Sequence, residues 1–206
     1  MPLTSSSIIQ EVKEKCDTGL ALMGYYYFDF RDIAKQDIRG LLASLLAQLC
    51  AESDSCHDLL SGPYHLKKNA QPDICLLVEC LKKMLQLPRQ PMIYIIMDAL
   101  DECPNSSGLG FQKTAREKVL GVLGELLDLN LPNLRICVTS RPEVDIRDIL
   151  ERRASHHMSL HDESGQKNDI LGYISSVVRT DRNMRRWRSA DKQLVIDALS
   201  AKADGM

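Results

Sequence analysis

The chain has 206 residues, of which 44% are hydrophobic and 26% are charged. These proportions are ordinary for a folded domain and exclude an intrinsically disordered chain. The formal net charge of −2 gives no overall attraction to nucleic acid or to an anionic membrane. The 7 cysteines include no C-x-x-C pair, and no apolar run is long enough to span a bilayer. We expect a cytoplasmic protein with reduced thiols, without a signal peptide or a membrane partner.

The first predicted element is a helix over residues 5–18, which begins with serines that can cap it. Its apolar residues recur at spacings of one, three and four and so lie on one face: Ile8, Ile9, Val12 and Cys16. The stretch LALMGYYYFDF over residues 20–30 predicts a strand, because aromatic side chains are enriched in strands.

Two long helices are predicted next, each from an apolar stripe with the period of a helix. The stripes run from Ile38 to Leu49 and from Ile74 to Leu85, with a loop over residues 61–73 between them. The apolar run from Met92 to Met97 predicts a buried strand, and a helix is predicted from about Thr114 to Leu127.

The last part of the chain continues the alternation. Residues 134–140 predict another buried strand, followed by a helix with Pro142 in its first turn. Residues 156–160 predict a short strand, and residues 168–178 predict a helix. A final helix begins at Ser189, and Gly205 stands where a glycine can end it. The side chains of this helix that are predicted to face inward are Leu194, Val195, Ala198 and Leu199.

Strands that alternate with helices predict the α/β class, with a parallel sheet and helices on both of its faces. Ligands of open parallel sheets bind at the carboxyl ends of the strands. Asp98 stands at such an end, and Asp101 and Glu102 follow it closely. In this position Asp98 can hold magnesium directly or through its water, while Asp101 or Glu102 can orient a nucleophilic water.

A second strand end offers the opposite charge. The stretch LRICVTSRPE presents Thr139, Ser140 and Arg141, and parallel topology puts them beside Asp98. The planar guanidinium of Arg141 can read a terminal phosphate, because its geometry matches phosphate oxygens and it stays charged. The alternatives are an ordinary turn aspartate at Asp98 and a surface arginine before a helix at Arg141.

Four stretches resemble one known family. MIYIIMDALDEC resembles the Walker B strand of NACHT-type STAND P-loop NTPases, in the nephrocystin-like form abundant in fungal proteins, and LRICVTSRPE resembles their sensor arginine strand. GYYYFDFRD and VIDALSAKADGM resemble the same family. The resemblance implies a three-layer P-loop NTPase core that uses magnesium and ATP or GTP. It also implies the site residues: Asp98 for magnesium through water, Asp101 and Glu102 as catalytic acids, and Thr139 and Arg141 at the nucleotide.

The phosphate loop of that family, G-x-x-x-x-G-K-[ST], is absent from the 206 residues. The resemblance implies that the loop comes just before the helix at 5–18. It also implies that the preceding strand lies between the strands at 134–139 and 156–160. We therefore expect a truncated core without the Walker A loop over residues 1–165, and the start of the following helical region over residues 166–206. We expect the chain alone to bind nucleotide weakly or not at all.

Three functions stay open. The first is a fragment of a signalling NTPase in which the nucleotide switches oligomerisation. The second is a non-catalytic module of the same fold that works through protein partners or self-association. The third is a metal-dependent hydrolase that uses Asp98, Asp101 and Glu102 directly.

One further stretch, RTDRNMRRWRSADK over residues 179–192, gathers arginines around Trp187. Such a pattern can contact nucleic-acid phosphates and stack an aromatic ring on a base. The interleaved acids and the negative net charge favour instead a solvated helix or loop with a packed tryptophan. We therefore expect no nucleic-acid partner.

Overall fold

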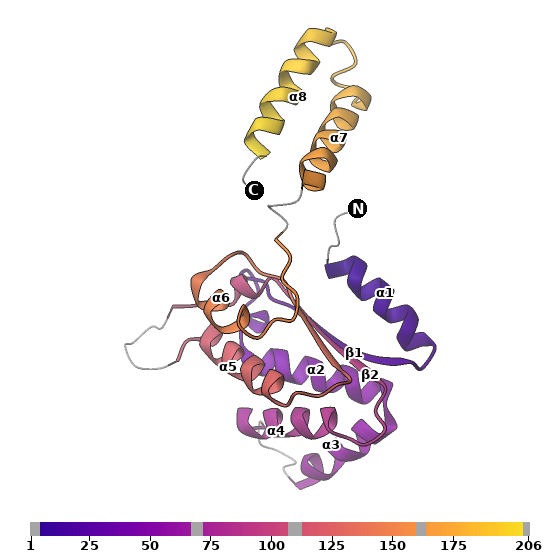
Figure 1. Cartoon of the computed structure of the whole chain (residues 1–206), viewed down its shortest axis with the longest axis vertical. Helices are drawn as coiled ribbons and strands as arrows, with labels where there is room; N and C mark the ends of the chain where they lie inside the picture. Colours follow the sequence, from indigo (N-terminus) through magenta and orange to yellow (C-terminus); the bar gives the residue numbers. More distant parts are fainter. Residues whose placement is uncertain (1–4, 67–71, 107–112, 160–163, 204–206) are drawn as a thin grey trace. The chain divides into compact units, whose positions relative to one another are not determined.

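A computed structural model describes residues 5–66, 72–106, 113–159 and 164–203. The chain divides into two compact units, Leu3–Ala154 and Ser155–Met206, and each is described by itself. The division expected from the sequence lies between residues 165 and 166. The first unit is a parallel sheet with helices on both of its faces (Figure 1).

The strands of the first unit pair in parallel in the order β1-β2-β3, with Ala21 opposite Met92 and Ile93 opposite Leu134. The predicted α/β class and the parallel sheet flanked by helices are confirmed. The elements in chain order are α1 Ser5–Asp17, β1 Ala21–Tyr27, η1 Ile33–Lys35, α2 Ile38–Glu52, α3 Asp54–Leu66, α4 Ile74–Leu85, β2 Met92–Asp98, η2 Leu100–Glu102, α5 Ala115–Asp128, β3 Leu134–Val138 and α6 Val144–Leu150.

The central strand β2 is apolar on both faces because each face packs against helices. Its residues Ile93, Ile95 and Met97 belong to the larger core, which also contains the buried leucines of α2, α4 and α5. On the opposite face, Ile96 packs with Val12 of α1 and Met23 of β1. The predicted apolar face of α1 is therefore the face that meets the sheet.

The two edges of the sheet differ. On β1, the Met23 N–H donates to Glu52 Oε2 at 2.9 Å, and the Gln48 amide bonds both the N–H and the C=O of Tyr25 at 3.0 and 2.9 Å. These side chains of α2 take the place of a neighbouring strand. On β3, the backbone of Ile136 points away from β2, and no described residue forms a hydrogen bond with it. Among the described residues, the sheet thus has one edge partly capped by α2 side chains, at β1, and one open edge, at β3.

Three predictions about the elements need correction. The loop expected over 61–73 begins later, because α3 runs through to Leu66. Pro142 lies outside α6, which begins at Val144 after the N-cap Glu143. Residues 156–159 form no strand, since they are mostly exposed and pair with none of the described strands; residue 160 lies outside the described residues.

The second unit contains α7 Ser164–Thr180 and α8 Ser189–Ala203, which pack against each other. The inward face predicted for α8 is wrong: Ile196 is 2% exposed, whereas Leu194 is 73% and Leu199 is 45% exposed. Ala198 is also exposed and Val195 is half-buried, while Gly205 lies outside the described residues. Among the helices that the structure describes, none combines the length and the apolar character needed to span a bilayer.

Candidate functional site

One hydroxyl group joins the carboxyl ends of β2 and β3. Thr139 Oγ1 donates to Asp98 Oδ1 at 2.5 Å and accepts from the Ala99 N–H at 3.0 Å. The Leu100 N–H donates to the Thr139 carbonyl at 3.0 Å. Ala99 has a left-handed φ of 55°, which is uncommon for a residue with a side chain, and η2 begins directly after it. This sharp turn keeps the following acids beside the strand ends.

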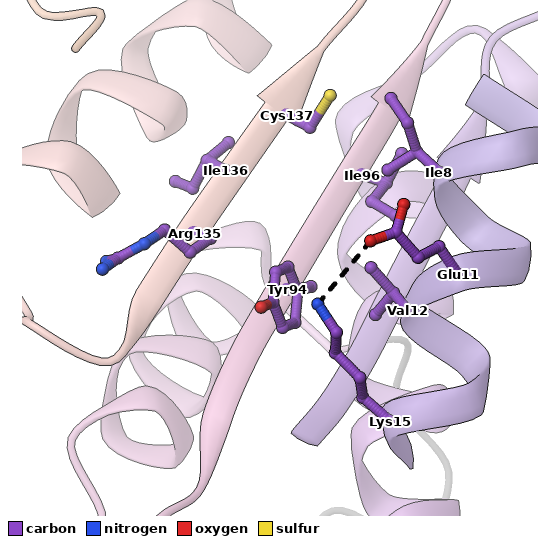
Figure 2. Close-up of a pocket in the computed structure, with 9 residues that line it drawn as sticks. All are labelled: Ile8, Glu11, Val12, Lys15, Tyr94, Ile96, Arg135, Ile136 and Cys137. Carbon is purple, nitrogen blue, oxygen red and sulfur yellow. Dashed lines mark ion pairs between the residues drawn. The ribbon is translucent and has the colours of Figure 1, made fainter. Parts of the chain in front are cut away.

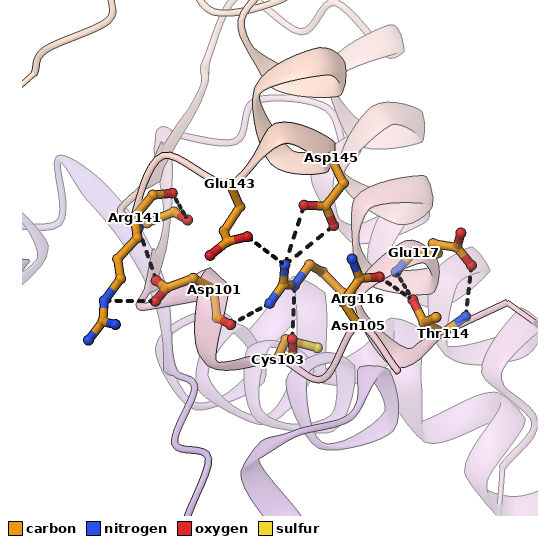
Figure 3. Close-up of polar contacts among 10 residues, drawn as sticks. Asp101, Cys103, Asn105, Thr114, Arg116, Glu117, Arg141, Glu143 and Asp145 are labelled. Atoms are coloured by element: carbon orange, nitrogen blue, oxygen red, sulfur yellow. Dashed lines mark hydrogen bonds and ion pairs between the residues drawn. The ribbon is translucent and has the colours of Figure 1, made fainter. Parts of the chain in front are cut away.

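Asp101 fixes the segment that follows β3. Its Oδ1 accepts a hydrogen bond from the Arg141 N–H at 3.1 Å, and its Oδ2 lies 3.4 Å from Arg141 Nε. The side chain of Asp101 is 11% exposed, whereas that of Arg141 is 81% exposed. The guanidinium therefore lies at the surface, held on one side by a nearly buried carboxylate (Figure 3).

The third acid reaches the end of β1. Glu102 Oε2 accepts from the Phe30 N–H at 3.1 Å, and the Asp98 carbonyl accepts from the Phe28 N–H at 3.1 Å. The acidic segment after β2 is thus bonded to both neighbouring strand ends. The structure brings all the site residues predicted from the sequence to this one edge of the sheet: Asp98, Asp101, Glu102, Thr139 and Arg141.

The negative charge of Asp98 acts on groups in both neighbouring strands. The pKa of Tyr27 in β1 is raised, mainly by burial and then by the carboxylate of Asp98. Burial and Asp98 raise the pKa of the Cys137 thiol in β3 in the same order. Both groups therefore hold their protons to a higher pH than they would in water.

Arg116 supports this edge from inside the protein, and it was not predicted from the sequence. Its guanidinium donates to the carbonyls of Cys103 at 2.9 Å and Asp101 at 2.5 Å, and it lies 3.3 Å from Asp145 Oδ1. A longer ion pair of 3.9 Å connects it to Glu143. Because its side chain is 8% exposed, Arg116 ties the turn after β2 to α5 and α6 (Figure 3).

A capping box at the start of α5 aims Arg116 at the turn. Thr114 Oγ1 accepts from the Glu117 N–H at 3.0 Å, and Glu117 Oε2 accepts from the Thr114 N–H at 2.8 Å. The Thr114 hydroxyl also donates to Asn105 Oδ1 at 3.1 Å. The helix therefore begins at a defined residue, and Arg116 lies in its first turn.

The acidic edge can be compared with what a magnesium–nucleotide complex requires. Magnesium prefers oxygen ligands and usually combines one or two carboxylates with water and phosphate oxygens. In the described ranges, no three His, Cys, Asp or Glu side chains gather as a metal site, so an ion at Asp98 would need such additional ligands. The phosphates require a loop of backbone N–H groups, and the 206 residues contain no G-x-x-x-x-G-K-[ST]. Of the groups at this edge, the Asp98 carboxylate alone is a candidate magnesium ligand, and the sequence contains no loop of the phosphate-binding pattern.

A cavity of about 330 Å³ lies away from this edge, between α1 and the strands β2 and β3 (Figure 2). Its walls include the apolar side chains of Ile8, Val12 and Ile96. Lys15 Nζ lies 3.9 Å from Glu11 Oε1 on the same helix and 5.7 Å from the ring centroid of Tyr94. None of the site residues predicted from the sequence lines this cavity.

Comparison with known families agrees with this arrangement. The family model described as Nephrocystin 3, N-terminal, matches residues 3–141, which is more than half of the chain. The match includes all three strands and the acidic edge through Arg141. No curated protein matches the chain. The chain belongs to the nephrocystin 3 N-terminal family.

Proposed function

We propose that this chain is the metal and sensor edge of a NACHT-type P-loop NTPase, in which bound nucleotide switches oligomerisation during signalling. The observation that carries the proposal is the pair of links across β2 and β3, Asp98 to Thr139 and Asp101 to Arg141. In the first link the Asp98 carboxylate at the end of β2 accepts from the Thr139 hydroxyl after β3. In the second, the Asp101 carboxylate contacts Arg141, whose guanidinium can also bind phosphate.

These links give the edge two ways to respond to a ligand. The Asp98 carboxylate would hold the magnesium ion, and it would then share its oxygens between the ion and the Thr139 hydroxyl. Arg141 would bond the phosphate through its exposed guanidinium, which Asp101 holds on one side. A change in either contact would alter the connection between η2 and the segment after β3.

The chain alone is expected to bind nucleotide poorly. Each phosphate contact from a loop contributes roughly 1.5 to 3 kcal/mol, so the loss of three removes on the order of 5 to 9 kcal/mol. A micromolar site has only about 8 kcal/mol of binding free energy in total. We therefore expect dissociation constants for MgATP and MgGTP of about 1 mM or weaker.

Nuclear magnetic resonance of the whole chain tests this proposal, because it detects weak binding residue by residue. On titration with MgATP or MgGTP, the backbone amide signals of Ala99, Asp101 and Arg141 are expected to shift. The shifts should shrink in Asp98→Asn and in Arg141→Ala. Arg147→Ala is the matched control, since Arg147 is also an exposed arginine in an ion pair, with Glu151.

Two outcomes would overturn the proposal. One is the absence of any magnesium-dependent shift at this edge with both nucleotides in large excess. The other is shifts that the Asp98 and Arg141 variants leave unchanged. Micromolar affinity would instead show that phosphates find a cradle elsewhere in the chain, which contradicts the expected weak binding.

A second candidate function is a protein-interaction module, and the open edge of β3 favours it. An unpaired strand edge is a template for another strand. The occupant that we propose is a second copy, paired antiparallel through β3. Ile136→Pro removes the outward N–H, while Ile136→Val keeps it and serves as the control. Sedimentation should show self-association for the wild type and the valine variant only; a monomeric wild type contradicts this candidate.

A further inference from the structure

The second unit carries a compact turn between its two helices. The turn follows Thr180 and ends at Ser189, where α8 begins. Asp181 Oδ1 accepts from the Asn183 N–H at 2.7 Å. Two further backbone hydrogen bonds fold the segment on itself, from Arg185 N–H to the Arg182 carbonyl at 3.3 Å and from Trp187 N–H to the Met184 carbonyl at 3.1 Å. The side chains of this turn therefore project from one short, ordered segment.

The turn concentrates positive charge that nothing in the described structure neutralises. Residues 179–192 contain six basic and two acidic residues. The arginines of this stretch are all exposed: Arg179, Arg182, Arg185, Arg186 and Arg188. None of them forms an ion pair with a residue in the described ranges. Free guanidinium groups at this density attract a polyanion.

Trp187 stands between Arg186 and Arg188 and is not packed as the sequence suggested. It is 46% exposed, whereas Val178 of α7 and Ile196 of α8 are each 2% exposed. A half-exposed indole offers a flat apolar surface beside the guanidinium groups. The packed tryptophan that the sequence suggested is therefore absent, and the interleaved Asp181 and Asp191 form no ion pair with these arginines in the described ranges.

We propose that the arginine–tryptophan segment 179–188, which consists of the last two residues of α7 and this turn, binds single-stranded nucleic acid. Every basic residue within it is an arginine, and the guanidinium group bonds two phosphate oxygens at once and stacks on bases, which lysine cannot do. Trp187 supplies a stacking surface, because every base has a π-face. An inserted membrane anchor would need a wider apolar face than one indole. An acidic peptide would leave the indole without a partner.

The strength of this binding should depend steeply on salt. If four arginines each neutralise one phosphate, the logarithm of the binding constant falls with a slope of about −2.8 against the logarithm of the salt concentration. That slope corresponds to about 50-fold weaker binding at 200 mM than at 50 mM salt. Little sequence preference is expected, since phosphates and stacking do not read base edges.

The chain offers a built-in probe, because Trp187 is its single tryptophan. The whole chain is titrated with oligouridylate of about eight nucleotides, while the intrinsic fluorescence of Trp187 and the anisotropy of a dye-labelled oligonucleotide are recorded. We expect quenching of Trp187, a slope near −2.8 in salt, and binding about tenfold weaker in Trp187→Ala.

Charge variants test whether the arginines of this segment cause the salt dependence. Arg185→Gln with Arg186→Gln should reduce the salt slope by about 1.4, whereas Lys13→Gln with Arg152→Gln, which removes two exposed charges outside the turn, should leave it unchanged. The proposal is overturned by equal slopes in the two double variants or by no binding at about 50 mM salt. It is also overturned if polyglutamate or phosphatidylserine vesicles quench Trp187 as strongly as the oligonucleotide.

Discussion

Arg116 is a full positive charge held where almost no water reaches it. Two backbone carbonyls and the carboxylate of Asp145 take over the hydrogen bonds that water would otherwise provide. Because both carbonyls belong to the turn after β2, the position of the acidic edge depends on this side chain. Loss of the guanidinium leaves those carbonyls without a donor in a site closed to water.

Replacement of Arg116 by alanine should therefore lower the free energy of unfolding by about 2 to 4 kcal/mol. Arg116→Lys should recover little of this, since a single ammonium group cannot reproduce the fork. Urea denaturation followed by circular dichroism measures the difference. Arg141→Ala, which removes an arginine that is 81% exposed, should change stability by less than about 1 kcal/mol. Equal losses in both variants would contradict the role given to Arg116.

Thr139 provides a second test on the scale of one residue. Thr139→Val keeps the shape of the side chain but removes the hydroxyl that joins the Ala99 N–H to Asp98. The expected loss is about 1 to 3 kcal/mol, because the N–H and the carboxylate both lose a partner. Thr139→Ser keeps the hydroxyl and should lose clearly less. The prediction fails if serine and valine destabilise the protein equally in the same denaturation assay.

The edge residues could be located from the sequence, but their supports could not. Asp98 and Thr139 each stand at the carboxyl end of a predicted strand, so parallel topology was enough to bring them together. The strand before Thr139 was predicted to be buried, but β3 is only half-buried and its Arg135 is exposed. Arg116 stands in the polar sequence TAREK, where an arginine in the first turn of a surface helix looks the same. Its burial follows from the later placement of α6 over α5, a tertiary contact without a local pattern.

On the scale of an element, two helical glycines differ in their surroundings: one lies against neighbouring atoms and the other faces open space. In α2, a Cβ at Gly40 would lie 2.6 Å from the Ala34 carbonyl oxygen and 2.8 Å from the Tyr26 hydroxyl. In α5, a Cβ at Gly121 would meet nothing within 4 Å. The same substitution should therefore have opposite effects at the two positions.

Gly40→Ala is expected to destabilise the protein by about 1 to 3 kcal/mol, because backbone atoms must move to admit the methyl group. Gly121→Ala should stabilise it by roughly 0.5 to 1 kcal/mol through the higher helix propensity of alanine. Thermal unfolding of the two variants beside the wild type measures both signs. A stabilised Gly40→Ala would mean that α2 does not approach Tyr26 as closely as described.

Elements with one clear stripe or a continuous apolar run were predictable, and elements without them were not. The apolar stripe of α2 is compatible only with a helix, and the continuous apolar run of β2 predicts a buried strand. In α8, apolar residues are spread around the whole helix, so the buried position Ile196 was decided by contact with α7 and not by the pattern. Residues 156–160 have the composition of a strand, but a strand needs a neighbour to pair with.

On the scale of the whole molecule, several thiols are kept protonated by folding. Burial is the largest cause in each case, and it raises the pKa of Cys16 and of Cys103 to about 11. Burial also raises the pKa of Cys50, Cys80 and Cys137. In the unfolded chain these thiols ionise from about pH 9, whereas in the folded protein they ionise only at higher pH. The folded state therefore binds more protons, and stability must fall as the pH rises from about 9 towards 11.

Denaturation in reducing buffer at about pH 8 and about pH 10.5 tests this expectation. The wild type should lose stability between the two values, and the buried Cys103 alone should account for about 2 kcal/mol of the loss near pH 11. Cys103→Ala should show a smaller loss over the same range, whatever its stability at pH 8. An identical loss in wild type and variant would exclude Cys103 as a contributor.

The unequal edges of the sheet also limit the size of any assembly that forms through it. A second copy that pairs antiparallel through β3 is related to the first by a twofold axis, so the contact uses the same surface on both copies. The outer strand of each copy is then β1, on which the Met23 N–H and both backbone groups of Tyr25 are already bonded to Glu52 and Gln48. These contacts oppose further strand addition at β1, the kind of open-ended growth that produces fibrils.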